Sequence, residues 1–195
     1  MFKSIIPVSL IDYPDKICTV LFTAGCNFNC PWCHNRDLID PDIYKKIPDI
    51  LLEDIKKILI ERKNFIEGIC ITGGEPLLYG EKLREFLRMI RDTIKLPVKI
   101  DTNGYLPHEL ELCYDENLID FTAMDIKNSF SKYSQTVGKE IDTSIIEQSI
   151  NLIKKRSPNW QFRITKVPHL VDEDDIKWIE NKFNVKLSVQ QYRPV

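Results

Sequence analysis

The sequence contains no apolar run of the roughly 18 residues that a membrane-spanning helix needs, and no targeting segment leads it. It also has no surplus of one charge, because 27 Lys and Arg stand against 29 Asp and Glu and give a net charge of −2. A near-neutral balance argues against nucleic acid as the main partner. We therefore expect neither a membrane nor a nucleic-acid partner, and we expect a cytoplasmic location.

Low-complexity stretches and interdomain linkers are lacking as well. A length of 195 residues suits one well-buried core and is short for two domains. We therefore predict a single domain over residues 1–195. Residues 1–16 are expected to form an irregular or hairpin-like lead-in, because Pro7 and Pro14 interrupt it.

The six cysteines are unevenly distributed along the chain. Cys26, Cys30 and Cys33 lie within eight residues, in a loop that follows an apolar run. With no secretory signal and this clustering, a disulfide framework is disfavoured. Three thiolates can hold three corners of a cubane iron–sulfur cluster, which normally takes four cysteines. The unfilled corner would leave one iron free to bind another ligand, as an incomplete ligand set does at a catalytic zinc.

Two other interpretations of this loop stay open on spacing alone. One is a structural zinc site with His34 or a distant cysteine as fourth ligand, although adjacent residues rarely wrap onto one metal. The other is a set of inert thiols. The remaining cysteines, Cys18, Cys70 and Cys113, fall in apolar strands or on a helix, so we predict that they are buried structural thiols.

From residue 17 onward, apolar strands alternate with amphipathic helices. This alternation predicts a parallel sheet with right-handed crossovers. Six strands and five helices are too few for a closed eightfold barrel, so we predict an α/β fold in the form of a partial, open (β/α)6 TIM-like barrel with outer helices. The expected strands are 17–22, 68–72, 97–100, 118–124, 160–167 and 185–191, and the expected helices are 49–62, 81–94, 107–115, 142–155 and 172–183, the last two capped by Asp142 and Asp172.

Polar motifs follow the carboxyl ends of these strands. The cysteine loop, Gly73–Pro76, Asp101–Gly104 and Asp125–Lys127 are all placed in this way. In barrels of this kind, that edge of the sheet carries the catalytic site. The sequence therefore predicts that these motifs meet in one site.

Taken together, the motifs resemble a known family. The spacing Cys26-x3-Cys30-x2-Cys33, followed by Gly-Gly-Glu-Pro at 73–76, is similar to the radical S-adenosylmethionine (SAM) enzymes. Within that superfamily the chain resembles the activating enzymes of glycyl radical enzymes. The resemblance is strongest to activators of anaerobic ribonucleoside-triphosphate reductase and next to the activator of pyruvate formate-lyase. The motifs that carry it are Cys33-His34-Asn35, Asp-Thr-Asn-Gly at 101–104, Met-Asp-Ile-Lys at 124–127 and the lead-in at 9–14.

The resemblance implies a mechanism. The open iron of one 4Fe–4S cluster would bind the amino and carboxylate groups of SAM. An electron from a flavodoxin or ferredoxin would cleave SAM into methionine and a 5′-deoxyadenosyl radical, which removes a hydrogen atom from a glycine of a partner glycyl radical enzyme. Such open clusters are sensitive to oxygen, so an anaerobic setting is expected. Relatives with extra clusters carry a cysteine-rich insert between His34 and Gly68, where this chain has no cysteine, so we expect a single cluster.

The resemblance also implies roles for individual residues. Cys26, Cys30 and Cys33 would be the cluster ligands. A monovalent cation would lie beside the SAM carboxylate, on the oxygens of Asp101, Thr102 and Asp125, with Asn103 belonging to the same cofactor-binding motif. The remaining SAM contacts would come from Trp32 at the adenine, Asn35 at the nucleoside, Gly73, Gly74 and Glu75 at the methionine amino group, and Lys127 and Arg163 at the carboxylate and neighbouring oxygens.

The chain departs from the family pattern at two places. Tyr192 and Arg193 stand where the pyruvate formate-lyase activators have Tyr-His, and His169 stands where glycine is frequent. Two alternative functions remain at this point. One is a radical SAM enzyme that acts on a peptide or a small metabolite, and the other is a non-catalytic zinc or electron-transfer module.

Overall fold

Within residues 1–194, which a computed structural model describes, seven strands form one sheet in the order β1-β2-β3-β4-β5-β6-β7. β1 pairs antiparallel with β2, and every later neighbouring pair is parallel. The strands are β1 (Phe2–Ser9), β2 (Cys18–Thr23), β3 (Gly68–Gly73), β4 (Val98–Thr102), β5 (Phe121–Asp125), β6 (Trp160–Lys166) and β7 (Leu187–Gln191).

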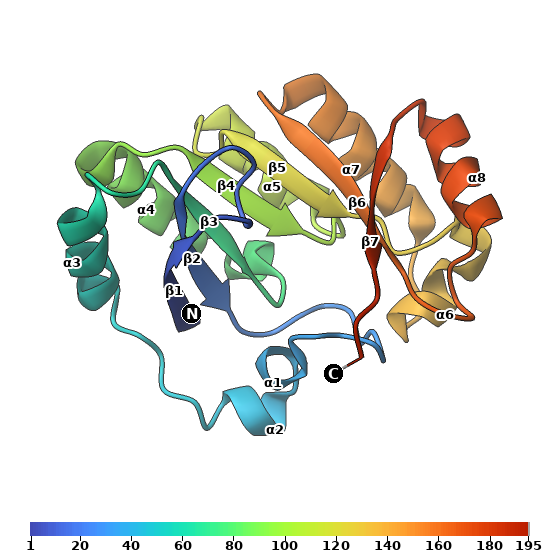
Figure 1. Cartoon of the computed structure of the whole chain (residues 1–195), viewed down its shortest axis with the longest axis horizontal. Coiled ribbons are helices and arrows are strands. Elements are labelled where there is room, and N and C mark those ends of the chain that lie inside the picture. The colour runs from blue at the N-terminus through green and yellow to red at the C-terminus, as the bar shows by residue number, and fades with distance from the viewer. Residues whose placement is uncertain (195) are drawn as a thin grey trace.

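The longer helices lie along the outer side of this sheet (Figure 1). Because β1 and β7 are the two edges of the sheet, the barrel is open between them. Asp142 and Asp172 cap α7 and α8 through hydrogen bonds to first-turn backbone amides, as predicted. The helices are α1 (Arg36–Ile39), α2 (Pro41–Tyr44), α3 (Leu52–Arg62), α4 (Glu81–Met89), α5 (Pro107–Asp115), α6 (Tyr133–Val137), α7 (Thr143–Arg156) and α8 (Glu173–Phe183).

The predicted partial barrel is confirmed, with differences at its ends and in its loops. The lead-in forms a hairpin, because β1 adds an antiparallel seventh strand that pairs with β2. The predicted helix at 81–94 is α4 followed by a π-helical turn at Ile90–Ile94. α1, α2 and α6 were not predicted, since each spans only four or five residues, too few to show a helical period.

Apolar residues cover both faces of the sheet. The outer face packs against α3, α4, α5, α7 and α8 in one large cluster, which includes Leu59, Leu87 and Ile150. Inside the barrel, Tyr13 closes a small cluster with Cys18, Val20 and Cys70. Cys18, Cys70 and Cys113 are buried, as predicted. Among residues 1–194, no helix is both long enough and apolar enough to cross a bilayer.

The turn after β3 packs backbone against backbone on the chain that follows β2. Gly74 N donates to Thr23 O at 2.9 Å, and Glu75 N donates to Gly25 O at 2.8 Å. A Cβ on Gly74 would lie 1.9 Å from Gly25 O, and Gly73 has a φ of +117°. Only glycine permits this approach and this backbone conformation. The two loops that begin the site are therefore fixed to each other by main-chain contacts.

Glu75 links the same turn to the end of β4. Its carboxylate is fully buried and accepts hydrogen bonds from Leu77 N at 3.2 Å, Thr102 Oγ1 at 2.9 Å and Asn103 N at 2.7 Å. Burial raises the pKa of Glu75 to about 7, although these hydrogen bonds work in the opposite direction. The side chain thus joins the turn after β3 to the end of β4, and the backbone N of the same residue joins both to the loop after β2.

The main-chain contact can be tested with Gly74→Ala. The added methyl group collides with a backbone oxygen that cannot rotate away, so we expect the free energy of unfolding to fall by about 3 kcal/mol. Gly80→Ala is the matched control, because its Cβ would meet nothing closer than 3.4 Å. Its φ of +49° and ψ of −123° lie outside the left-handed helical region, so this control should show backbone strain alone, about 1–2 kcal/mol. Urea unfolding of both apoproteins under reductant measures the difference, and equal losses would contradict this account.

Burial of Glu75 predicts a pH dependence of stability. Its pKa is about 7 in the folded protein against an ordinary value of 4.5, so the folded chain binds more protons between these values. Stability therefore falls as pH rises through that window. Glu75→Gln carries no ionisable group, so its stability relative to the native protein should improve by about 2 kcal/mol between pH 5 and pH 8. Urea unfolding across this range measures the effect; parallel curves for the two proteins would refute it.

Candidate functional site

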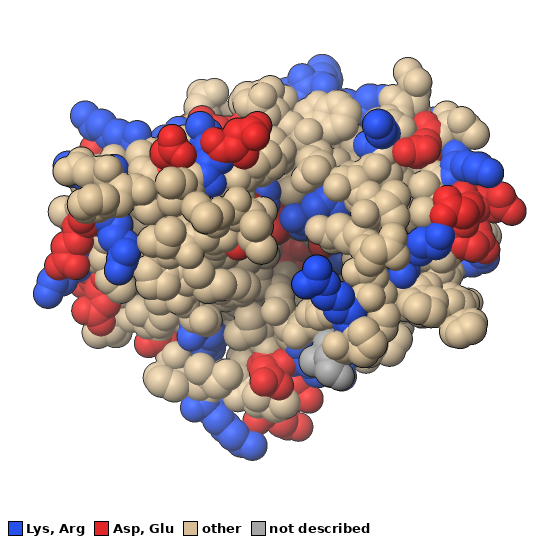
Figure 2. All heavy atoms as spheres, in the orientation of Figure 1, with Lys and Arg blue, Asp and Glu red and all other residues tan. Residues whose placement is uncertain are grey.

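A cavity of about 410 Å³ lies at the carboxyl edge of the strands. Figure 2 shows the molecule hollowed near the middle of this face, with acidic and basic atoms inside the hollow. All but one of the residues predicted for the site line this cavity. They are Cys26, Cys30, Trp32, Cys33, Asn35, Gly73, Gly74, Asp101, Thr102, Asn103, Asp125, Lys127 and Arg163.

Glu75 is the predicted residue that the structure places elsewhere. Its carboxylate does not line the cavity. Three hydrogen bonds, from Leu77 N, Thr102 Oγ1 and Asn103 N, hold it beneath the turn. The neighbouring Gly73 and Gly74 do line the cavity. The turn therefore offers its backbone to the cavity and keeps the carboxyl group of Glu75 beneath it.

The cysteine loop is held by α6 and the residue that follows it. Asn29 N donates to Val137 O at 3.0 Å, and the Trp32 indole donates to Thr136 O at 3.0 Å. A Cβ on Gly138 would lie 2.5 Å from Asn29 O, so this contact is again a close backbone approach. The shape of the loop depends on a segment about a hundred residues further along the chain.

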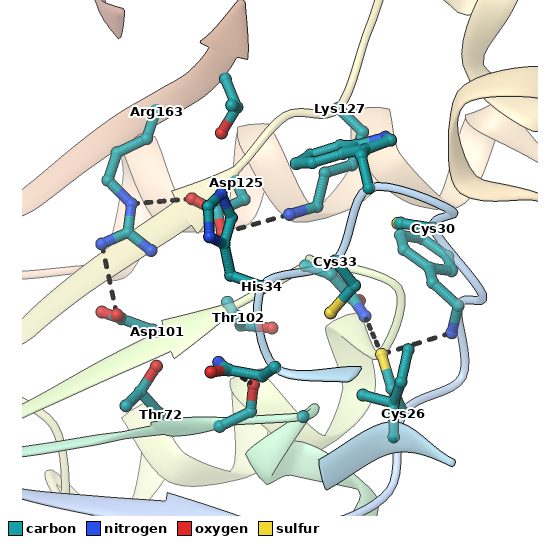
Figure 3. Close-up of a pocket in the computed structure, with 18 of the residues that line it drawn as sticks. Cys26, Cys30, Cys33, His34, Thr72, Asp101, Thr102, Asp125, Lys127 and Arg163 are labelled. Carbon is teal, nitrogen blue, oxygen red and sulfur yellow. Dashed lines mark hydrogen bonds and ion pairs between the residues drawn. The ribbon is translucent and has the colours of Figure 1, made fainter. Parts of the chain in front are cut away.

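Of the three loop thiols, Cys30 is buried, and Cys26 and Cys33 are half-buried. Cys26 Sγ accepts hydrogen bonds from Phe28 N at 3.4 Å and from Asn103 Nδ2 at 3.7 Å (Figure 3). Burial raises the pKa of Cys26 to about 12 and also raises the pKa of Cys30. These thiols are therefore protonated at neutral pH. They would have to release their protons when a metal binds to the sulfur atoms.

The donor set fits an iron–sulfur group. Three soft sulfur ligands line one cavity, as a cluster held at three corners requires. In the chain as described, residues 1–194, no three His, Cys, Asp or Glu side chains are already gathered closely enough to hold one metal ion. The fit therefore rests on the donor set and its shared cavity rather than on a preformed coordination geometry.

Opposite charges alternate along the floor of the cavity. The guanidinium of Arg163 bridges Asp125, at 2.7 Å, and Asp101, at 3.2 Å, while Lys127 Nζ lies 3.2 Å from Asp125 (Figure 3). Burial disfavours every one of these charges, yet Arg163 and Lys127 hold the pKa of Asp125 below its usual range. The pKa of Lys127 is raised despite its burial, because Asp125 stabilises the ammonium. Asp125, Lys127 and Arg163 are therefore ionised at neutral pH.

The Trp32 ring and the Asn35 amide also line the cavity. The ammonium of Lys127 lies 5.2 Å from the centre of the Trp32 ring, a cation–π distance. Asn35 Nδ2 donates to Gly73 O at 3.2 Å, so the cysteine loop and the Gly-Gly turn also meet through a side chain. His34 lines the cavity too, and its ring centre lies 5.8 Å from that of Tyr192.

The two departures from the family pattern have different settings. His169 has a φ of +66°, in the left-handed region that glycine adopts most easily, which accounts for glycine being frequent there. Tyr192 and Arg193 lie beyond the end of β7 at Gln191. Tyr192 packs against the main core, whereas Arg193 is exposed.

Several residues of the cavity were missed in the sequence. Thr72, Thr165 and Gln190 line it, and each stands at or near the carboxyl end of a strand, so position alone could have indicated them. Asp12 also lines it from the β1–β2 connection, which belongs to the lead-in predicted to be irregular or hairpin-like. Lys99 lies behind the cavity, two residues before Asp101 on β4, and the period of two along a strand could have revealed it.

Comparison with known proteins gives the family. The model of the radical SAM superfamily matches residues 20–180. A protein of Methanocaldococcus jannaschii, provisionally named glycyl-radical enzyme activating enzyme MJ1227, is 35% identical over all of this chain and 80% of its own length. Pyruvate formate-lyase 1-activating enzyme of Escherichia coli K12 is 27% identical over 80% of this chain, which spans 63% of that enzyme.

Solved structures agree on the fold. The structure described as native anSMEcpe with bound AdoMet has a TM-score of 0.64 at 22% identity, over 87% of this chain and 50% of its own. At this identity the likeness concerns the fold alone. The chain thus spans about half of that structure and less than two thirds of the E. coli enzyme. The superfamily match and the M. jannaschii relative, which is similar over the whole of this chain, show that the chain belongs to the radical SAM superfamily and, within it, to the glycyl-radical enzyme activating enzymes.

Proposed function

We propose that this protein activates a glycyl radical enzyme, with a 4Fe–4S cluster and SAM bound in the cavity described above. The observation that supports it most is the meeting of three thiols, an aromatic face, a bare Gly-Gly backbone and two cations in one cavity. Each of these suits a different part of a cluster-bound SAM molecule. When bound, the reduced cluster and SAM supply a 5′-deoxyadenosyl radical that can remove a hydrogen atom from glycine.

The chain's own residues then have separate tasks. Cys26, Cys30 and Cys33 would hold the cluster as thiolates after losing their protons. The backbone at Gly73 and Gly74 can approach the methionine amino group, since no side chain stands in the way.

Charge and stacking would fix the rest of SAM. Lys127 and Arg163 would attract the methionine carboxylate, because both are cations at the cavity wall with part of their donor capacity free for a ligand. Trp32 would offer its ring to the adenine, and Asn35 would stand beside the nucleoside.

A protein partner suits the surface around the cavity. Leu10 and Ile11, in the β1–β2 connection, are 73% and 90% exposed, and Asp12 beside them lines the cavity. Exposed apolar residues at the mouth of a site are typical of surfaces that bind another protein. We propose anaerobic ribonucleoside-triphosphate reductase as the partner, a flavodoxin or ferredoxin as electron donor, and the cytoplasm as the place of reaction.

The cluster assignment predicts the behaviour of Cys30→Ala. After anaerobic reconstitution with iron and sulfide, the native protein should show an iron–sulfur absorption band and release 5′-deoxyadenosine from SAM under a strong reductant. Cys30→Ala removes a ligand and should lose both properties. Cys113→Ala is the matched control, because that thiol is buried on α5 away from the cavity, and it should keep both. Retained cleavage by Cys30→Ala would disprove the assignment.

The partner assignment has its own test. The reconstituted protein, SAM and reductant are mixed with anaerobic ribonucleoside-triphosphate reductase, and electron paramagnetic resonance is recorded. A glycine-centred signal in the reductase supports activation. SAM cleavage without such a signal, for this and other glycyl radical enzymes, would favour a peptide or small-metabolite substrate instead.

The carboxylate assignment predicts the effect of Lys127→Ala. Loss of a partly buried charged hydrogen bond should weaken SAM binding about tenfold or more and leave the cluster spectrum unchanged. Lys166→Ala serves as control, since Lys166 pairs with Glu173 at the surface. Isothermal titration calorimetry on the reconstituted proteins measures both, and unchanged affinity in Lys127→Ala would remove this role.

A further inference from the structure

Lys99 is a buried cation that the proposed function does not yet use. Its side chain is 2% exposed, its ammonium contacts Asp101 Oδ1, and it lies 3.6 Å from the thiol of Cys70. Burying an ammonium is costly unless it is paired. The carboxylate of Asp101 supplies that pairing and keeps the pKa of Lys99 raised although burial works against the charge. Because burying a charged lysine is costly, we expect Lys99 to have a role at the cavity.

The contacts of the carboxylate oxygens in the cavity indicate this role. Asp101 gives Oδ1 to Lys99 and Oδ2 to Arg163. Asp125 gives Oδ1 to Arg163 and Oδ2 to Lys127. Each of the four oxygens therefore already contacts a cation that belongs to the protein.

These are the oxygens that the family resemblance assigns to a monovalent cation. The third member of that set, Thr102, uses its hydroxyl to donate to Glu75 at 2.9 Å and to accept from Gly104 N at 3.0 Å. A monovalent metal ion needs several oxygen ligands with free lone pairs directed at one point. The residues present do not fit such an ion, because at each carboxylate oxygen it would lie beside an ammonium or guanidinium group that already contacts that oxygen.

The net charge of these side chains also disfavours a metal ion at this place. The series Lys99, Asp101, Arg163, Asp125 and Lys127 alternates in sign and sums to one positive charge. One positive charge balances one ligand carboxylate. Adding a metal cation would leave an uncompensated charge in a largely buried site, which is unfavourable where the effective dielectric is low.

We propose that the ammonium of Lys99 takes the place of the monovalent cation, as a positioning residue that fixes Asp101 and, through it, the guanidinium of Arg163. The cavity then binds the methionine carboxylate of SAM without a metal ion beside it. This inference rests on the proposed function, because it assumes that the cavity binds SAM.

The experiment measures the dissociation constant of SAM for the anaerobically reconstituted protein by isothermal titration calorimetry. Potassium, sodium and choline chloride are compared at equal ionic strength, because choline is too large to enter a metal site. For the native protein we expect the three values to agree within about twofold, a factor smaller than typical ligand coupling.

Lys99→Met exposes the inference to a stricter test. It keeps a long side chain but leaves Asp101 Oδ1 without a cation, so a metal ion can now bind there. We expect SAM affinity to fall in choline chloride and to recover about tenfold in potassium chloride. The double variant Lys99→Met/Asp101→Asn removes both charges, and the dependence on potassium should disappear again.

Lys132→Met is the matched control. Lys132 also contacts two carboxylates, those of Asp172 and Asp175, but at the surface and away from the cavity. Its loss should leave SAM binding equal in all three salts. Cluster absorption and thermal unfolding identify any variant that does not fold, and Lys99→Gln then replaces Lys99→Met with the same expectation.

The outcomes separate the two proposals. A native protein that binds SAM more than about twofold more tightly in potassium or sodium chloride than in choline chloride overturns the role of Lys99 alone. A folded Lys99→Met or Lys99→Gln protein with no response to potassium does so as well. The absence of SAM binding in every salt overturns the proposed function, and this inference falls with it. The comparison of salts on the native protein needs no variant to fold.

Discussion

The site depends on a backbone contact that only glycine allows. The turn at Gly73 and Gly74 lies directly against residues 23–25, and Glu75 N completes the contact through Gly25 O. Beneath the turn, the buried carboxylate of Glu75 joins it to Thr102 and Asn103. The loops after β2, β3 and β4 are therefore one rigid unit, and the cysteines, the Gly-Gly backbone and the acidic end of β4 keep fixed positions relative to one another.

On the neighbouring strands, electrostatics replaces backbone packing. β4, β5 and β6 bring charged side chains into the barrel, where each would be unstable alone. Asp101, Arg163 and Asp125 are stable because each contacts a charge of opposite sign on both sides. Such a series holds its members in place and leaves a net charge of one sign facing the cavity. Binding of an anionic group thus requires little rearrangement of the protein.

The sequence predicted the fold and the membership of the cavity well, because both follow from periodicity and from where strands end. The strands after residue 17 and most polar motifs at their ends are found where expected. Glu75 shows the limit, since a motif locates a residue on a loop but does not say whether its side chain faces the cavity or the loop beneath it. α6 shows another limit, because a five-residue helix has no period to detect and its contacts to the cysteine loop are distant in sequence.

The attachment of the cysteine loop to α6 has a consequence for biosynthesis. A nascent chain leaves the ribosome from its N-terminus, so Cys26, Cys30 and Cys33 emerge long before Val137 and Gly138, which fix the loop from behind. Until about a hundred further residues have been made, the three thiols have no template to order them. Iron and sulfide that reached the chain before that moment would find the three cysteine thiols without a fixed arrangement. A cluster that binds the ordered loop would therefore have to arrive after residue 138 has left the ribosome.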